Sequence, residues 1–214
     1  MKIGILMETS TAMRNKDVVE ALKSSAHEVY NLGLTGDTSE TQLTTVETGF
    51  MSALILNLRC VDMVVGGCGT GQGYMNSVLQ YPGIVCGLID DPLHAWLFSQ
   101  INAGNCISLA LNKGYGWAGE VNLKFIFDHL FEKTPGIGYP PCRMQAQKSI
   151  RERQKEVSVA THLPFQDILS RLDPEMVRRA LMHRDFYKFV LEHAYVDLPL
   201  FDVFKRYCSK LIGV

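Results

Sequence analysis

Up to about residue 132, short apolar runs alternate with longer segments in which apolar residues recur at helical spacing. Five runs predict buried strands, at residues 2–7, 27–33, 62–67, 83–89 and 105–111. Helical spacing follows in four places: from Val18 to Leu22, from Val46 to Leu56, just after Pro92 and across residues 120–131. Strands that alternate with helices are typical of a parallel sheet covered on both faces. The pattern therefore predicts a three-layer α/β/α fold around a five-stranded, parallel, Rossmann-like sheet.

Local signals mark where elements begin and where the sheet unit ends. The sequence SETQ at 39–42 has the form of a capping box and predicts the start of the second helix. Residues 133–143 contain three prolines and two glycines, which neither a helix nor a central strand tolerates. From about 145 to 212 only helical spacing remains, with Asp173 and Asp197 as predicted helix starts. We expect an α/β domain at 1–144 and an all-helical extension at 145–214, which forms either a small subdomain or arms that wrap a neighbouring subunit.

Composition narrows the class of ligand. The chain has 214 residues, a formal net charge of −1 and no run of Lys or Arg, so nucleic-acid binding is not expected and a small neutral or anionic ligand is favoured. The apolar run at the amino terminus is too short for a signal peptide or a membrane span, which predicts a cytoplasmic protein without membrane partners.

The six cysteines contain no C-x-x-C pair, and the six histidines lack zinc-ligand spacing. We therefore expect reduced thiols, no metal and no cofactor.

The turn GGCGTGQG at 66–73 carries the most informative chemistry, because ligands of parallel α/β sheets bind at the carboxyl ends of the strands. Its glycines are expected to adopt positive φ and to let the backbone approach a ligand, and the following helix would direct free N–H groups at an anion. The same field would stabilise a thiolate on Cys68, which could then act as a base. The alternative is a tight turn in which Cys68 is only a small buried side chain. Nucleotide binding is not favoured, because the turn lacks the lysine of a P-loop and the full G-x-G-x-x-G pattern.

Three motifs occur in the order of a known family: CGTGQG at 68–73, the DP pair at 91–92 and QINAGN at 100–105. Over residues 1–145 the chain resembles the ribose-5-phosphate isomerase type B and galactose-6-phosphate isomerase family, in particular a longer subgroup with a helical tail. The resemblance implies an aldose–ketose isomerase that acts on a pentose or hexose phosphate through a cis-enediolate. It also implies a homodimer or homotetramer with the active site at the subunit interface.

The resemblance assigns roles to the glycine-rich turn. Cys68 matches the family's usual enolising base, and Thr70 matches a threonine that assists ring opening. The backbone amides of the neighbouring glycines would face the anionic hole that stabilises the enediolate, and these glycines are Gly69, Gly71 and Gly73.

The resemblance also implies a set of substrate-binding residues further along the chain. Asn102 and Asn105 match two asparagines of the family, the first of which contacts sugar hydroxyls. Arg143 falls where an arginine of the partner subunit binds the phosphate.

The chain departs from the family at three points. The family's Asp-His pair after the first strand is replaced by Glu8 and Thr9, Ile101 stands where many members carry a histidine acid, and Tyr139 replaces a first phosphate-binding arginine. Glu8 is then the best carboxyl for acid–base or hydroxyl-binding work, with Thr9 beside it as a substrate contact. Glu8 would face Cys68 if the first and third strands are neighbours, as they are in the family. The alternative is that Glu8 only caps the helix that follows.

Two other classes of function remain beside the isomerase. A non-catalytic phosphosugar or nucleotide sensor could use the same fold, with the missing histidines recording a loss of chemistry. An assembly protein is poorly supported, because the glycine-rich turn would then have no use.

Overall fold

The computed structural model describes residues 1–23 and 25–213. Its sheet contains five parallel strands in the order β2-β1-β3-β5-β4. These strands are β1 (Lys2–Met7), β2 (Glu28–Asn31), β3 (Met63–Cys68), β4 (Cys86–Ile89) and β5 (Cys106–Ala110). All five lie within the predicted runs or within one residue of them, so the predicted parallel sheet is confirmed.

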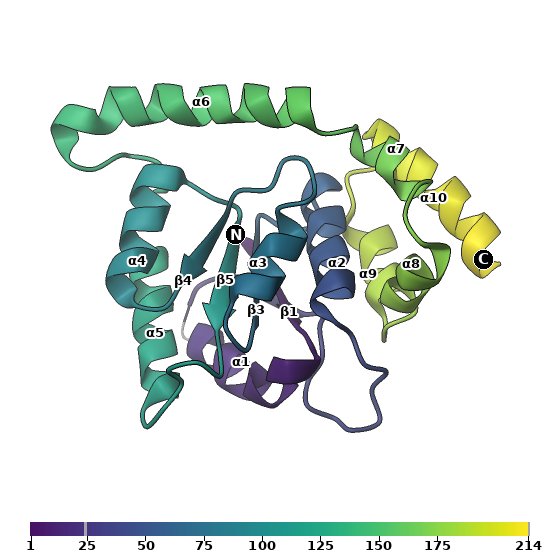
Figure 1. Cartoon of the computed structure of the whole chain (residues 1–214), viewed down its shortest axis with the longest axis horizontal. Helices are drawn as coiled ribbons and strands as arrows, with labels where there is room; N and C mark the ends of the chain where they lie inside the picture. The colour runs from purple at the N-terminus through teal and green to yellow at the C-terminus, as the bar shows by residue number, and fades with distance from the viewer. Residues whose placement is uncertain (24, 214) are drawn as a thin grey trace.

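Helices cover both faces of the sheet, as predicted (Figure 1). One face packs on α1 (Asn15–Lys23), α4 (Pro92–Leu97) and α5 (Gly119–Leu130), and the other on α2 (Thr45–Asn57) and α3 (Gln72–Val78). The alternation of side chains along a strand explains the two cores, since Ile3 and Ile5 belong to the first and Leu6 to the second. Strands buried on both faces account for the continuous apolar runs of the sequence.

The second helix begins later than SETQ predicts. Its capping box consists of Thr44 and Glu47, with the Val46 backbone N–H donating to Thr44 Oγ1 at 3.1 Å and the Thr44 N–H donating to the Glu47 carboxylate at 2.8 Å. Glu40 of SETQ instead accepts a hydrogen bond from the Thr35 N–H at 2.8 Å and pairs with Arg184 at 3.7 Å. The prediction was wrong because the same S/T-x-x-E/Q spacing occurs twice, and in the first copy the Ser39 hydroxyl donates to Asp37 Oδ1 at 2.8 Å instead of capping a helix.

The carboxyl-terminal extension is all helical over its described residues, as predicted. It consists of the 3₁₀ segment η3 (Pro141–Arg143), α6 (Met144–Thr161), α7 (Phe165–Leu169), α8 (Pro174–Leu181), α9 (Phe186–His193) and α10 (Pro199–Ile212). Asp173 is the N-cap of α8, as expected, whereas α10 begins at Pro199 with Leu198 rather than Asp197 at its N-cap. Helices α7 to α10 share one apolar core with α2, where Phe165 stacks on Phe50 with ring centroids 6.3 Å apart. A domain boundary at 144/145 stays a prediction.

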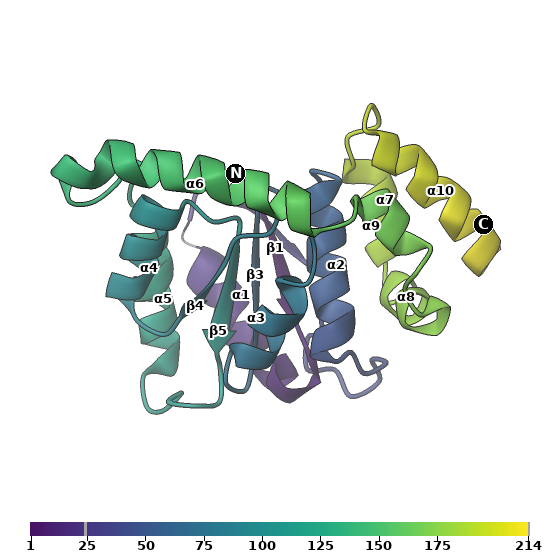
Figure 2. The same ribbon diagram turned by 45° about the horizontal axis from the view of Figure 1, so that its top comes forward.

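Helix α6 lies as a single bar along one edge of the molecule, from α4 to α7 (Figures 1 and 2). None of its residues is buried. It contacts the segments that precede β4 and β5, since the Gly83 N–H donates to Ser158 at 3.4 Å and Arg151 donates to Ile101 O at 2.8 Å. α6 therefore covers the amino ends of the strands and leaves their carboxyl ends free. Within the described parts of the chain, we find no helix that combines the length and the apolar character needed to cross a membrane.

Candidate active site

Cys68 is the last residue of β3, the central strand, which lies between β1 and β5 (Figure 1). Only 7% of its surface is exposed. Its Sγ lies 3.9 Å from Thr70 Oγ1, and a Cβ added at Gly73 would lie 3.6 Å from the sulfur. Gly73 and Thr70 are themselves exposed. The thiol thus lies one layer below the surface, under a position that has no side chain.

The turn after Cys68 is fixed by backbone hydrogen bonds. The Cys68 carbonyl accepts from the N–H groups of Gly71 and Leu111, both at 3.1 Å. The Gly69 N–H donates to Ser10 Oγ at 3.2 Å. Two of the three amides expected in the anionic hole are therefore engaged within the chain. The N–H of Gly73, in the first turn of α3, has no hydrogen-bond partner among the residues that the structure describes.

Most glycines of the turn are needed because a side chain would collide with neighbouring elements, and not because the backbone adopts unusual angles. Of the glycines expected to adopt positive φ, only Gly71 does so, at 75°. A Cβ on Gly66 would lie 2.1 Å from the ring of Tyr74, and one on Gly67 would lie 2.5 Å from the carbonyl oxygen of Leu109. These glycines are required because α3 and β5 approach the strand closely.

Glu8 follows β1, which is the neighbour of β3 as expected, and it is only 5% exposed. It is the N-cap of η1 (Thr9–Arg14), and its carboxylate accepts hydrogen bonds from the Ser10 N–H at 2.9 Å, from the Ser10 hydroxyl and from the Thr11 hydroxyl at 3.4 Å. Ser10 also accepts a hydrogen bond from the Gly69 N–H, so among the described residues it is Ser10 that connects Glu8 to the Cys68 turn. Thr9 is exposed, and its hydroxyl donates to the Leu43 carbonyl at 2.7 Å.

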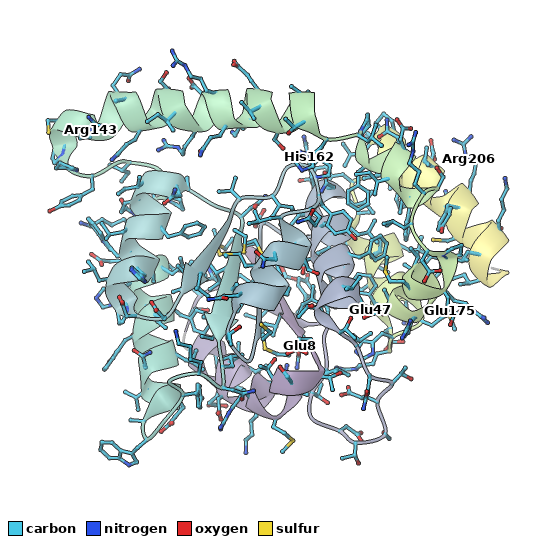
Figure 3. All side chains as sticks on the ribbon, in the orientation of Figure 1. Glu8, Glu47, Arg143, His162, Glu175 and Arg206 are labelled. Carbon is cyan, nitrogen blue, oxygen red and sulfur yellow. The ribbon has the colours of Figure 1, made fainter. Side chains whose placement is uncertain are left out.

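Asn102, Asn105 and Arg143 lie at the other end of the sheet from Cys68. Asn105 directly precedes β5, and Cys68 is paired with Ala110, five residues further along that strand. Five residues of extended strand separate Asn105 from the level of Cys68 by about 16 Å. Its side chain accepts from the Val85 N–H and donates to the Gly83 carbonyl, each at 2.9 Å, and so fixes the entry to β4. Figure 3 shows Arg143 at the start of α6 and Glu8 below the middle of the molecule, on the side of the sheet away from that helix. Within one chain, the structure does not bring these residues to the thiol.

Asn102 lines a groove of about 640 Å³ between α6 and the loops that precede β4 and β5. The groove is largely apolar, with Ile84, Phe98 and Val159 among its walls. Arg143 is exposed at the start of α6. Both predicted substrate contacts are therefore accessible to a second molecule.

Three residues of the site were missed from the sequence: Ser10, Thr45 and Asn112. The side-chain amide of Asn112 donates to the Ser10 carbonyl at 2.9 Å, which holds η1 against the turn after β5. The side chain of Thr45 lies 3.5 Å from the Cβ position of Gly73, beside the thiol. Ser10 and Asn112 stand in turns at the carboxyl ends of predicted strands, and that position was the available signal.

Comparison with known proteins places this geometry in a family. The family model described as Ribose/Galactose Isomerase matches residues 3–134. A crystal structure of 4-deoxy-L-threo-5-hexosulose-uronate ketol-isomerase complexed with a tartrate is 32% identical, with a TM-score of 0.93 over 100% of both chains. A ribose-5-phosphate isomerase from Vibrio parahaemolyticus is 38% identical, with a TM-score of 0.91 over 99% of both chains.

More distant structures share the fold alone. The type B ribose 5-phosphate isomerase of Leishmania infantum is 13% identical, with a TM-score of 0.64 over 75% of this chain and 98% of its own. A search of curated proteins found no match. The family match spans the sheet, the glycine-rich turn and the helices on both faces, and the two more similar structures extend over the helical tail. The chain belongs to the ribose/galactose isomerase family and is a sugar isomerase.

Proposed function

We propose that this protein is an aldose–ketose isomerase that acts on a sugar phosphate through a cis-enediolate, with Cys68 as the base. The observation that carries the proposal is the position of the thiol, at the carboxyl end of the central strand and beneath Gly73. A sugar bound above Gly73 would present its reacting C–H bond to the Cys68 sulfur. The oxygen of the developing enediolate would lie near the free N–H of Gly73. Base and oxyanion donor would thus act on the same substrate.

The thiolate of Cys68 would take the proton from the carbon next to the carbonyl and return it to the adjacent carbon. A positioned base contributes about 10² to 10⁴ in rate. An amide donor to the enediolate oxygen contributes about 10² to 10³. Thr70, whose hydroxyl lies 3.9 Å from the sulfur, would contact the ring oxygen during opening.

A second copy of the chain would complete the site. Asn102 and Arg143 lie at the opposite end of the sheet from Cys68, so they can act on the same sugar only when they belong to a neighbouring subunit. We therefore propose a homodimer or homotetramer in which Arg143 of one subunit binds the anionic group of the sugar held at Cys68 of another.

An acid sugar is the second candidate substrate. Two observations favour it: Thr9 and Tyr139 occupy positions where the resemblance implies substrate-binding histidine and arginine, and one full-length relative is a ketol-isomerase of a hexosulose uronate. A carboxylate carries less charge than a phosphate and needs fewer cationic partners. One exposed arginine, Arg143, could then suffice.

The test is proton exchange in D₂O with a panel of pentose phosphates, hexose phosphates and hexuronates. We expect deuterium at C1 or C2 of one class of sugar, and a loss of about 10² to 10⁴ in rate for Cys68→Ala. Cys60→Ala is the matched control, because it removes another buried thiol of the same core at the opposite end of β3. Exchange that is unchanged in Cys68→Ala would remove the cysteine from the mechanism, and binding without exchange across the panel would favour a sensor.

A further inference from the structure

Ser10 links the buried Glu8 carboxylate to the turn that carries Cys68. Its hydroxyl donates to Glu8 Oε1 and accepts from the Gly69 N–H at 3.2 Å. The peptide bond of that N–H is the one that joins Gly69 to Cys68. Ser10 is exposed, whereas Glu8 is 5% exposed. Of the two, only the serine hydroxyl is accessible to a substrate.

The hydrogen bonds fix the direction of the Ser10 proton. An amide N–H only donates, so the Ser10 oxygen accepts the bond from Gly69 and its hydroxyl donates the bond to Glu8 Oε1. The one proton of the Ser10 hydroxyl must therefore point to Glu8, and a lone pair of its oxygen must point toward Gly69. A hydroxyl in this state is ready to accept a proton from a substrate oxygen while it passes its own proton to the carboxylate.

An aldose–ketose isomerisation needs such a group. Besides the proton that moves between carbons, one hydroxyl oxygen of the substrate must lose a proton and the former carbonyl oxygen must gain one. The base that acts on carbon does not perform this second transfer.

On the basis of the proposed function, we propose that Ser10 and Glu8 form a proton relay that moves the oxygen-bound proton of the substrate. Ser10 Oγ takes the proton of the C2 hydroxyl as the Ser10 proton passes to Glu8. The reverse transfer then delivers a proton to the oxygen on C1. Only O–H bonds break and form in these two transfers, and the protein ends in its starting state. Ser10 touches the substrate in this scheme, and Glu8 is a positioning residue that acts through Ser10.

A purely structural role would be that of a local bond between side chains, and the chain contains a comparable example in a turn. Ser39 donates both its N–H and its hydroxyl to Asp37 Oδ1, at 2.9 and 2.8 Å. The residue spacing is that of Glu8 and Ser10, although Ser39 uses a single carboxylate oxygen. The Asp37–Ser39 pair stands in the exposed loop before α2, and among the described residues it makes no hydrogen bond to the Cys68 turn. Ser39→Ala therefore measures the cost of losing such a local serine–carboxylate bond alone.

The experiment compares Ser10→Ala, Glu8→Gln, the double variant, Ser10→Thr and Ser39→Ala on the substrate found by the D₂O panel. We expect kcat to fall by about 10² in Ser10→Ala with KM little changed, and Ser10→Thr to retain most of kcat because it keeps the hydroxyl. The double variant should be no slower than the slower single variant, because both substitutions break one relay. Thermal unfolding of each variant separates this loss from the loss of the η1 cap.

Two results overturn the relay while leaving the isomerase in place. One is a Ser10→Ala enzyme that is as fast as Ser39→Ala while Cys68→Ala is slow. The other is a double variant whose loss is the product of the two single losses. If the wild-type protein exchanges no proton with any sugar of the panel, the proposed function itself fails, and the relay with it.

Discussion

Arg151 of α6 donates a hydrogen bond from Nη1 to the carbonyl oxygen of Ile101 at 2.8 Å. Its Nη2 donates to the carbonyl oxygen of Gly136, also at 2.8 Å. One guanidinium thus joins α6 to the segment before β5 and to the loop that leaves α5. α6 buries none of its own side chains, so these two bonds are a main cause of its fixed position along the amino ends of the strands.

We predict that Arg151→Lys loosens α6 although it keeps the charge, because an ammonium lacks the planar pair of donors that reaches both carbonyls. Amide hydrogen exchange in α6 should accelerate about tenfold, the equivalent of roughly 1.4 kcal/mol. Arg153→Lys, at an exposed position of the same helix, is the control. Equal protection of α6 in both variants would show that the two bonds do not hold the helix.

Gly73→Ala should leave the fold intact and block the site. The added methyl group would lie 3.5 Å from Thr45 Cγ2 and 3.6 Å from Cys68 Sγ, which are ordinary contacts, and alanine favours a helix by about 1 kcal/mol over glycine. We expect an unchanged or slightly higher Tm and a large loss of kcat/KM. Gly116→Ala, where a Cβ meets nothing within 4 Å, is the control. A Gly73→Ala enzyme with normal kcat/KM would mean that the substrate does not lie above this glycine.

Phe165→Ala should destabilise the whole protein by about 3 to 5 kcal/mol, because the ring is buried against Phe50 and Tyr81 in the core shared by the tail and α2. Urea unfolding should show one transition at a lower midpoint. Val159→Ala, at a position 80% exposed, should change little. Two separate transitions, with only one of them shifted, would show instead that the extension folds independently of the sheet.

Acid should weaken the fold partly through His183, whose side chain is 4% exposed and whose pKa is lowered from its usual value by burial. Below the unfolded pKa of about 6.5, the unfolded chain binds the proton more readily than the folded chain. The free energy of unfolding should therefore fall as pH drops from 6.5 toward the lower folded pKa, by at most about 1.4 kcal/mol per pH unit.

His183→Gln should remove this part of the pH dependence, as measured by urea unfolding at pH 7 and pH 5. The half-buried His162 offers the control His162→Gln. The His183 explanation fails if the two variants lose stability in acid as steeply as the wild type.

Subunit mixing tests whether one site uses two chains. Cys68→Ala and Arg143→Ala should each be inactive alone. After they are unfolded together and refolded, mixed oligomers should regain activity, because one kind of interface then combines an intact Cys68 with an intact Arg143. Activity that never returns, from variants that refold and assemble normally, would contradict a shared site.

The sequence predicted the elements that depend on local pattern and missed the contacts that depend on the assembled fold. Strands buried on both faces and the glycine-rich turn have strong local signatures, so the sheet and the place of Cys68 could be predicted. The bond between Ser10 and Gly69 joins residues 59 positions apart, and no local pattern contains it. SETQ misled for a different reason: its spacing also fits a turn, and there the Ser39 hydroxyl donates to Asp37, two residues earlier.

Asn105 illustrates a second limit. A match to a family motif gives a residue's identity, but not the partners of its side chain. In this structure both ends of the Asn105 amide are engaged by the backbone before β4. The predicted contact with a sugar would require one of these bonds to break.

The separation between Cys68 at the carboxyl ends of the strands and Arg143 beyond their amino ends has an evolutionary consequence. If each site takes its base from one subunit and its anion contact from the next, the two functions are encoded in segments that do not touch within a chain. Substitutions at Asn102 and around Arg143 could then adapt the enzyme to a new sugar while the strand that holds the thiol stays unaltered. Substrate preference could thus diverge without any change to the residues that carry out the proton transfer.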